Sequence, residues 1–285
     1  MLVWLGQRRV NCARHPRPHD VMPVRIARNA FAPGIPARDV LLSPDHAVHV
    51  DGGLIPVRYL LNGATVTQEN VTQISYFHVE LEPHDVLLAE GMPAESYLDT
   101  GNRAAFANGG KGVMAHPDFA LRTWQAKSCA PLVHEGPGLA AVRASLLARA
   151  IELGHATTAA AEPVLLVDGR TLTPDMVGTT LHFRLPAGAR DIRLLSRAAI
   201  PAQCETASGD HRRLGIAVAG MTADGQTIHL DDPRLTTGWH QPEACWRWTD
   251  GEATLILEGI RSLQINVALT TTYWVAPPSR AAQAA

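Results

Sequence analysis

A hydroxyl and an imidazole lie three residues apart in the segment Ser43-Pro44-Asp45-His46, at the start of a predicted strand. When the turn between them is tight, both side chains can converge on one peptide group. An imidazole titrates near neutral pH, so His46 can pass a proton to or from a reacting group. A second imidazole, His84, lies in the turn-like segment Glu82-Pro83-His84-Asp85. Ser43, His46 and His84 are therefore the candidate catalytic residues.

Each candidate histidine also has a structural interpretation. His46 by residue type alone would be an ordinary hydrogen-bonded histidine of a strand, since buried polar groups are normally paired. His84 follows Pro83 and would then be a turn residue. The chemistry of both positions therefore depends on the elements that hold them.

Those elements are predicted to be β-hairpins. Asp-Gly pairs at 51–52, 168–169, 224–225 and 250–251 lie between apolar runs, and this dipeptide favours tight hairpin turns. The stretches 41–50 and 54–57 read as two paired strands around the first of these turns. A second hairpin is predicted from 74–81 and 86–88. Residues 1–103 are thus expected to be all-β.

Helical periodicity occurs between Gly138 and Leu153, where apolar residues recur at three- and four-residue steps before Gly154. We expect residues 104–160 to be a connector with this one amphipathic helix. Alternating strands return at 181–185, 214–218 and 263–269, which indicates an antiparallel β-sandwich over 161–280, followed by a tail at 281–285. The predicted fold class is mainly all-β.

Composition excludes several classes of protein. The hydrophobic fraction is 46% and the charged fraction 18%, so the chain is expected to fold. A net charge of −2 gives no electrostatic reason to expect nucleic acid as a partner. No apolar run approaches the length of a membrane span, and no signal peptide is visible, so the compartment stays open.

The segment Leu41-Leu42-Ser43-Pro44-Asp45-His46-Ala47-Val48-His49-Val50-Asp51-Gly52 resembles the hydroxyl-x-x-His motif of hedgehog/intein (Hint) domains, in their bacterial variant. Phe77-His78-Val79-Glu80 and then 84–91 resemble the late motif of that family. The resemblance covers roughly residues 3–103. It implies a self-processing domain, in which a Cys or Ser attacks the preceding carbonyl in autoproteolysis or protein splicing.

By this resemblance, His46 would polarise the scissile peptide and protonate its departing nitrogen. Ser43 would help to orient the peptide, and His84 would support a later cleavage step. The family's nucleophile block is expected upstream of Trp4, where it is missing. The expectation is therefore an amino-terminally truncated Hint domain, inactive alone, whose partner would be a complementary amino-terminal Hint half.

Three other groups of residues give weaker indications of a functional site. Cys12, His15 and His19 are interrupted by prolines and lack further ligands, so no metal and no cofactor is predicted. The loop 109–112 lacks the Ser or Thr of a phosphate-binding loop. Trp246, Arg247 and Trp248 could stack on a sugar, or the tryptophans could fill the sandwich core. A non-catalytic sandwich that binds carbohydrate or a protein surface is therefore the alternative function.

Overall fold

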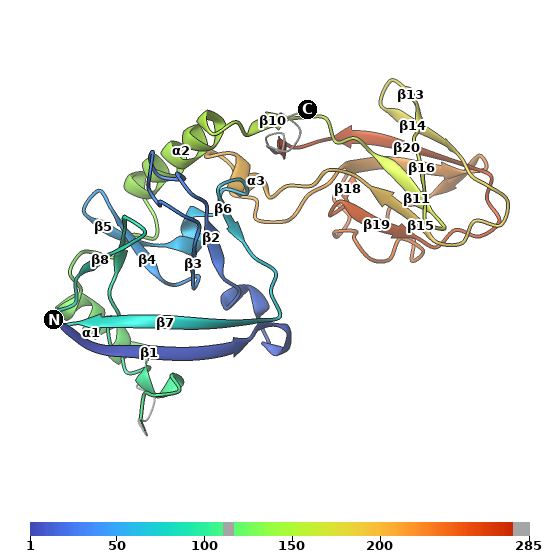
Figure 1. Ribbon diagram of the computed structural model, residues 1–285. Helices are drawn as coiled ribbons and strands as arrows, with labels where there is room; N and C mark the ends of the chain where they lie inside the picture. Colours follow the sequence, from blue (N-terminus) through green and yellow to red (C-terminus); the bar gives the residue numbers. More distant parts are fainter. Residues whose placement is uncertain (111–116, 276–285) are drawn as a thin grey trace, which may run out of the picture. The chain divides into compact units, whose positions relative to one another are not determined.

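The computed structural model describes residues 1–110 and 117–275 (Figure 1). The end of the predicted loop at 109–112 and the predicted tail at 281–285 lie outside the described residues. Contacts divide the chain into two compact units, Met1–Gly154 and a second that begins at His155. No helix in the described ranges is long and apolar enough to cross a membrane.

The described residues of the first unit form three antiparallel sheets. One is a ribbon of β1 (Leu2–Asn11) and β7 (Gln73–Leu81). The second has the order β3 (Val40–Leu42), β2 (Val24–Ile26), β6 (Val66–Gln68). The third has the order β5 (Gly53–Pro56), β4 (Ala47–Val50), β9 (Met92–Glu95), β8 (Val86–Ala89). Short 3-10 helices are η1 (Cys12–Arg14), η2 (Pro18–Asp20), η3 (Val57–Leu60) and η4 (Arg103–Ala105).

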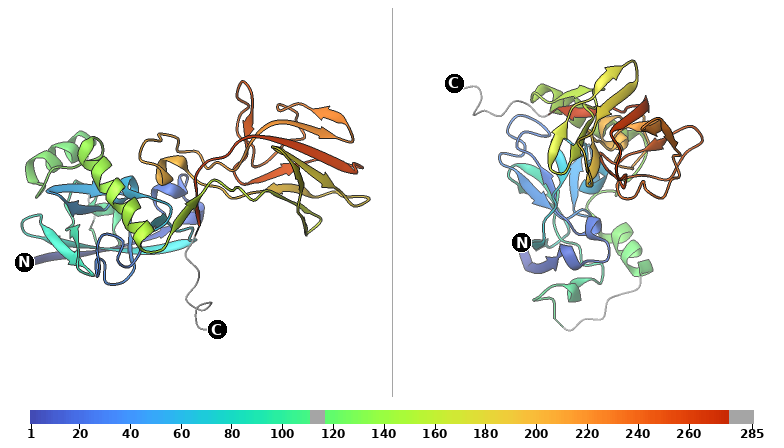
Figure 2. Two further views of the ribbon diagram at one scale, coloured as in Figure 1. Left: turned by 90° about the horizontal axis from the view of Figure 1, so that it is seen from above. Right: turned by 90° about the vertical axis from the view of Figure 1, so that its right-hand side faces the viewer.

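The predicted amphipathic helix is confirmed as α2 (Pro137–Glu152). Its apolar face places Leu139, Val142 and Leu146 in the same core cluster as residues of β2, β4 and β5. Figure 2 shows α2 packed along the strands of the first unit. A further helix, α1 (Pro117–Lys127), lies in the connector, for which only the one helix near 138–153 was predicted.

One predicted hairpin is confirmed around its turn, although its first stretch, 41–50, is divided into β3 and β4, and the other hairpin is wrong. β4 pairs with β5, and both turn residues have positive φ, 49° at Asp51 and 81° at Gly52, as a tight hairpin turn requires. Strand β7 does not pair with β8. Instead β7 pairs with β1 and β8 pairs with β9. Alternation identifies a strand but not its partner, because pairing depends on which faces become buried together.

The second unit is an antiparallel β-sandwich. One sheet has the order β12 (Arg170–Leu172), β11 (Val164–Val167), β15 (Ile192–Leu195), β19 (Glu252–Leu255). The other has the order β13 (Asp175–Val177), β14 (Thr180–Arg184), β20 (Ser262–Leu269), β16 (Ala217–Ala223), β17 (Gln226–Ile228), with β18 (Arg247–Trp248) beside β16. A short pair, β10 (Ala156–Thr158) with β21 (Tyr273–Val275), and the helix α3 (Pro201–Cys204) complete the unit.

Both sheets of the sandwich contribute to one apolar core. Leu165 and Ile192 of the first sheet lie in the same buried cluster as Leu181 and Ile265 of the second. Side chains of alternate residues point to this core, which is why the period-two pattern was informative. The predicted mainly-β fold class is therefore confirmed.

Candidate functional site

A cavity of about 240 Å³ lies in the first unit. Its walls come from the β1–β7 ribbon, the turn before β4, the end of β9 and the segment that follows β9. The polar side chains that line it include Ser43, His46, Tyr76, His78, Glu95 and Tyr97. Residues far apart in the sequence therefore meet at one site.

Strand alternation decides which side chains of the β1–β7 ribbon line the cavity. Tyr76 and His78 of β7 line the cavity, whereas Phe77 between them is 61% exposed. Phe106 packs edge-on against His78, with ring centroids 5.0 Å apart, and Trp4 of β1 lies 5.1 Å from the Phe106 ring. These aromatic rings exclude water from one side of His78.

The candidate pair Ser43 and His46 lies on the same cavity. The backbone N–H of His46 donates to the carbonyl oxygen of Ser43 at 3.0 Å, which closes the tight turn that the spacing predicted. The His46 ring centroid lies 5.8 Å from that of His78. Ser43 and His46 therefore line the same cavity.

Both cavity imidazoles are held in the neutral form. Burial, and then the neighbouring His78, lower the pKa of His46 to about 4. Burial, with a smaller contribution from Arg8, lowers the pKa of His78 to about 4. A neutral imidazole has one N–H donor and one acceptor nitrogen, so at pH 7 each ring can accept a proton or offer a hydrogen bond.

Glu95, at the end of β9, is an acidic residue that lines the same cavity as His46 and His78. Its side chain is 10% exposed, and its Oε1 accepts a hydrogen bond from the backbone N–H of Ala47 at 2.7 Å. Burial raises the pKa of Glu95 to about 8, with nearby Asp45 acting in the same direction. At neutral pH the carboxyl group is therefore mainly protonated.

His84 has a different environment. It is buried, and its Nδ1 accepts a hydrogen bond from the backbone N–H of Cys129 at 3.0 Å. The ring proton must then be on Nε2, which donates to the carbonyl oxygen of Ser96 at 3.0 Å. Burial lowers the pKa of His84. Both ring nitrogens are thus bonded to backbone groups.

A smaller cavity of about 180 Å³ adjoins the first one through shared walls. Ser43, His46, Tyr76 and His78 line both. Its remaining wall includes Leu41 and Phe77, which are 43% and 61% exposed. The two imidazoles can therefore be approached from an apolar rim.

The sequence did not single out His78 or Glu95 as site residues. His78 lies in a strand whose alternation was visible, but alternation alone does not tell which face meets Ser43 and His46. No signal in the sequence distinguishes Glu95 from other acidic residues. Its importance follows from burial, which requires the fold.

In the second unit, Trp246, Arg247 and Trp248 do not form one surface. Trp248 is 7% exposed and packs with Leu214 and Ala217. The Arg247 guanidinium donates to the carbonyl oxygens of His240 and Leu230 and lies 5.6 Å from the Trp239 ring centroid. The core interpretation is thus the one that fits Trp248.

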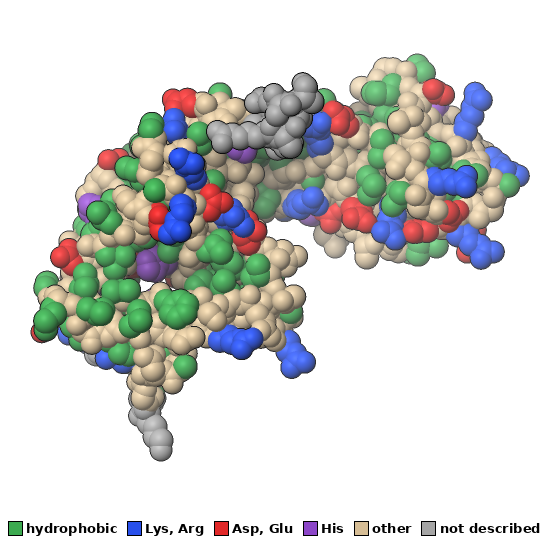
Figure 3. All heavy atoms as spheres, in the orientation of Figure 1, with side chains coloured by type: hydrophobic (Ala, Val, Ile, Leu, Met, Phe, Trp, Pro, Cys, Tyr) green, Lys and Arg blue, Asp and Glu red, His purple; other side chains and the backbone are tan. Residues whose placement is uncertain are grey.

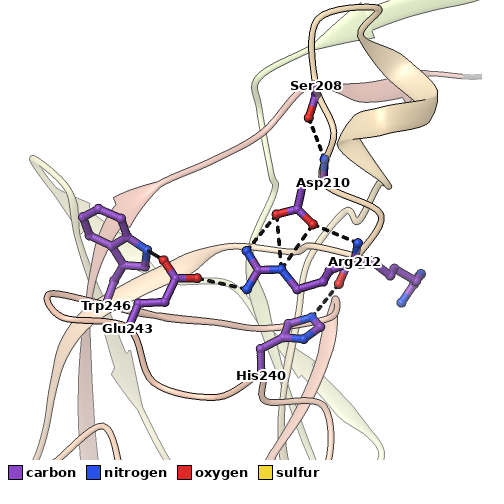
Figure 4. Close-up of polar contacts among 7 residues, drawn as sticks. Ser208, Asp210, Arg212, His240, Glu243 and Trp246 are labelled. Carbon is purple, nitrogen blue, oxygen red and sulfur yellow. Dashed lines mark hydrogen bonds and ion pairs between the residues drawn. The ribbon is translucent and has the colours of Figure 1, made fainter. Parts of the chain in front are cut away.

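Trp246 belongs to a polar network near the surface, which Figure 4 shows. Its indole N–H donates to Oε2 of Glu243 at 2.9 Å, and Oε1 of Glu243 accepts from Arg212 at 2.9 Å. Arg212 also binds the carboxylate of Asp210, whose pKa is lowered chiefly by this hydrogen bond. This network links loop 208–213 to loop 240–246.

The cysteines lie apart from the cavity lining. Cys12 is fully buried, and its Sγ lies 3.8 Å from the carbonyl oxygen of Val21. His15 bonds the carbonyl oxygen of Arg17. Within residues 1–110 and 117–275, no three His, Cys, Asp or Glu side chains are grouped as metal ligands would be.

Comparison with known proteins identifies the first unit. The family model described as Hint domain matches residues 1–101. No curated protein and no solved structure matches the chain. The matched range contains β1, β7, the turn before β4 and the end of β9, all of which contribute to the cavity wall, and it contains both motifs that carried the resemblance. Residues 1–101 of this chain are therefore a Hint domain.

Proposed function

We propose that the first unit is the reaction site of a Hint-type, self-processing rearrangement of a peptide bond, with His46 as the acid–base group. The observation that carries the proposal is the convergence of Ser43, His46 and His78 on one cavity. Partly desolvated imidazoles that line a cavity are typical of catalytic sites.

In the proposed reaction a Cys or Ser attacks the carbonyl carbon of the peptide bond before it. A new sulfur–carbon or oxygen–carbon bond forms, and the carbon–nitrogen bond breaks. Neutral His46 accepts the proton of the attacking thiol or hydroxyl and passes it to the departing amide nitrogen. The Ser43 hydroxyl orients the peptide group. Charge and proton number are thereby conserved.

For His84 we propose a supporting role in the later cleavage step. Its two backbone bonds hold the ring still, so it would act by position rather than by exchanging protons. Asp85 follows it directly, and the Asp85 backbone N–H donates to the Ser96 hydroxyl at 3.0 Å. The segment after β9 is thus tied to the loop that carries His84.

The proposal takes the nucleophile from an amino-terminal Hint segment, supplied upstream or as a separate chain. None of the described cavity-lining residues is a cysteine. The outer face of the β1–β7 ribbon exposes Val3, Leu5 and Phe77, and Figure 3 shows apolar side chains gathered over this part of the unit. Such a face and its strand edges suit the addition of further strands.

The test is to join a Cys-containing amino-terminal Hint segment of a relative to Met1. Incubation with dithiothreitol followed by intact-mass analysis reports cleavage. His46→Ala should slow cleavage about 10²–10⁴-fold, the range for a positioned acid–base group. His49→Ala, on the adjoining strand β4, is the matched control. The chain without the added segment should not cleave itself.

Equal cleavage rates for wild type and His46→Ala would contradict the assigned role. A folded fusion that binds the added segment but never cleaves would contradict the proposed activity itself. Release of fragments by the unfused chain would show instead that the nucleophile lies within these 285 residues.

The alternative function, carbohydrate binding by the second unit, has one observation in its favour. Of the three predicted binding residues, Trp246 is partly exposed and lies beside the acidic Glu243. Under this alternative, oligosaccharides would change the tryptophan fluorescence of the full chain, and Trp246→Ala would abolish the change. No response to a panel of neutral and acidic oligosaccharides would contradict it.

A further inference from the structure

The Glu95 carboxyl group has one bonded oxygen and one unbonded oxygen. Oε1 accepts from the Ala47 backbone N–H at 2.7 Å. Oε2 is fully buried and has no hydrogen-bond partner among the described residues. A carboxylate in this position would leave a buried negative charge without a donor, which is costly. The same position accommodates a protonated carboxyl group far more readily.

The groups in direct contact with the Glu95 carboxyl group offer no permanent positive charge among the described residues. The nearest ring nitrogen is Nε2 of His84, 3.8 Å from Oε2, and its proton is already donated to Ser96. No Lys or Arg nitrogen lies within 4 Å of the carboxyl group in the described part of the chain. The other titratable or charged groups nearby, or on the cavity wall, include Arg8, Asp20, Asp45, His46, Tyr76, His78, Asp85, Tyr97 and Cys129.

Glu95 is also tied to the segment that carries His46. Its side chain binds the N–H of Ala47, the residue after His46. Its backbone also lies beside the His46 ring, where it favours the protonated form of His46. Through these two links, any change at Glu95 reaches the proposed acid–base group directly.

We infer that Glu95 is a positioning residue of the Hint cavity that holds His46 in place while its own carboxyl group is protonated. Loss of that proton would create an unpaired buried anion. The anion would draw the Nε2–H of His84 away from Ser96 or admit water, and either change would disturb the end of β9. The Ala47 N–H, whose hydrogen bond favours the ionised carboxylate, would stay bound to Oε1, so the shift at the end of β9 would move the segment of His46 with it. The effect of Glu95 on catalysis rests on the proposed function, whereas its effect on the position of His46 does not.

The first test uses the full chain and needs no activity. Nuclear magnetic resonance of labelled histidines should show the His46 ring signal moving in a second step, near pH 8, where burial places the pKa of Glu95. Glu95→Gln, a neutral side chain of the same shape, should remove this step. Glu90→Gln is the matched control, since Glu90 pairs with Arg38 at the surface, and it should leave the step unchanged.

A His46 signal without the second step in wild type would overturn the inference, and so would a step that persists in Glu95→Gln. If the Gln variant does not fold, infrared spectroscopy of the wild type decides instead. A protonated carboxyl band at pH 7 that disappears above pH 9 supports the inference. Absence of that band at pH 7 overturns it.

The second test uses the cleaving fusion described above. In the wild-type fusion the cleavage rate should fall above about pH 8. In Glu95→Gln this fall should be absent. Glu95→Ala should cleave slowly at every pH. An alkaline limb that remains in Glu95→Gln would overturn the role of Glu95 and leave His46 intact. A fusion that fails to cleave at all pH values would count against the proposed function, and the resonance experiment would still decide the structural link.

Discussion

The two units bury different kinds of side chain. In the first unit, the described buried polar residues are Asn62, Thr65, His84, Glu95, Ser96 and Thr123, and two further histidines line the cavity. In the second unit, Thr249 is the one described buried polar residue, and its hydroxyl bonds the backbone of Ile216. Ionisable groups of the sandwich instead pair at the surface.

Under the proposed function, this difference separates a unit that buries ionisable groups at its reaction site from one that buries mainly apolar side chains. Burial lowers the pKa of His46 and raises the pKa of Glu95, so both side chains are mainly neutral at pH 7. Burying these groups costs folding stability. In the sandwich, Asp232 has its pKa lowered to about 2 by hydrogen bonds from Arg234, which stabilises a loop without burying charge. Strongly shifted pKa values of buried cavity groups are enriched at functional sites, which is consistent with the proposed function.

The largest expected effect comes from removing the helix that closes the core of the first unit. A fragment of residues 1–103 should fail to fold as a monomer, because Leu139, Val142 and Leu146 of α2 would be missing from the core. Residues 155–275 should fold alone. Size-exclusion chromatography and thermal unfolding check both fragments. A monomeric 1–103 fragment with cooperative unfolding would show that α2 is dispensable.

The sandwich should be sensitive to loss of packing. Trp248→Ala should lower the free energy of unfolding of the second unit by about 3–5 kcal/mol, the usual cost of truncating a buried aromatic residue. Trp246→Ala, which removes a partly exposed ring, should cost clearly less. Denaturant unfolding of residues 155–275 measures both. Similar losses for the two variants would contradict the assignment of Trp248 alone to the core.

The first unit should instead be sensitive to pH. Glu95 has a folded pKa of about 8 against 4.5 unfolded, so the folded state holds the proton longer and stability falls as pH rises between these values. About 2 kcal/mol should be lost between pH 6.5 and 8.5. His46 and His78 have lowered pKa values, so they cause a loss as pH falls from 6.5 to 4. Maximum stability is therefore expected near pH 6.5.

Hydrogen exchange of core amides in each unit, measured from pH 5 to 9, separates the two responses. Glu95→Gln should flatten the alkaline side for the first unit, because its side chain cannot ionise. The second unit serves as the internal reference within the same molecule. A wild-type first unit whose stability rises from pH 6.5 to 8.5 would be incompatible with a neutral Glu95.

The smallest effect is expected for a surface pair of the sandwich. Asp210→Asn removes the ion pair with Arg212, whose side chains are 30% and 42% exposed. Exposed pairs typically contribute about 0–1 kcal/mol, so the unfolding free energy of residues 155–275 should change by no more than this. Denaturant unfolding at low and high salt provides the measurement. A larger, salt-independent loss would show that the network of Figure 4 holds the two loops in place.

Local features of the molecule were accessible from the sequence. Asp51-Gly52 predicted a hairpin because only a few residue types adopt positive φ readily, and the spacing of Leu139, Val142 and Leu146 predicted a helix because their side chains share one face. Ser43 and His46 lie within one turn, so their proximity needed no distant contact. The Hint resemblance rested on two such local motifs.

The tertiary structure decided the rest, because it depends on segments far apart in the chain. The pairing of β7 with β1 brings His78 to His46, and the pairing of β4 with β9 buries Glu95 beneath Ala47. The same non-local packing buries Trp248 and leaves Trp246 near the surface. Sequence pattern determines the conformation of a strand or helix, whereas the partner of each face, and with it the pKa of a buried group, is set by long-range burial.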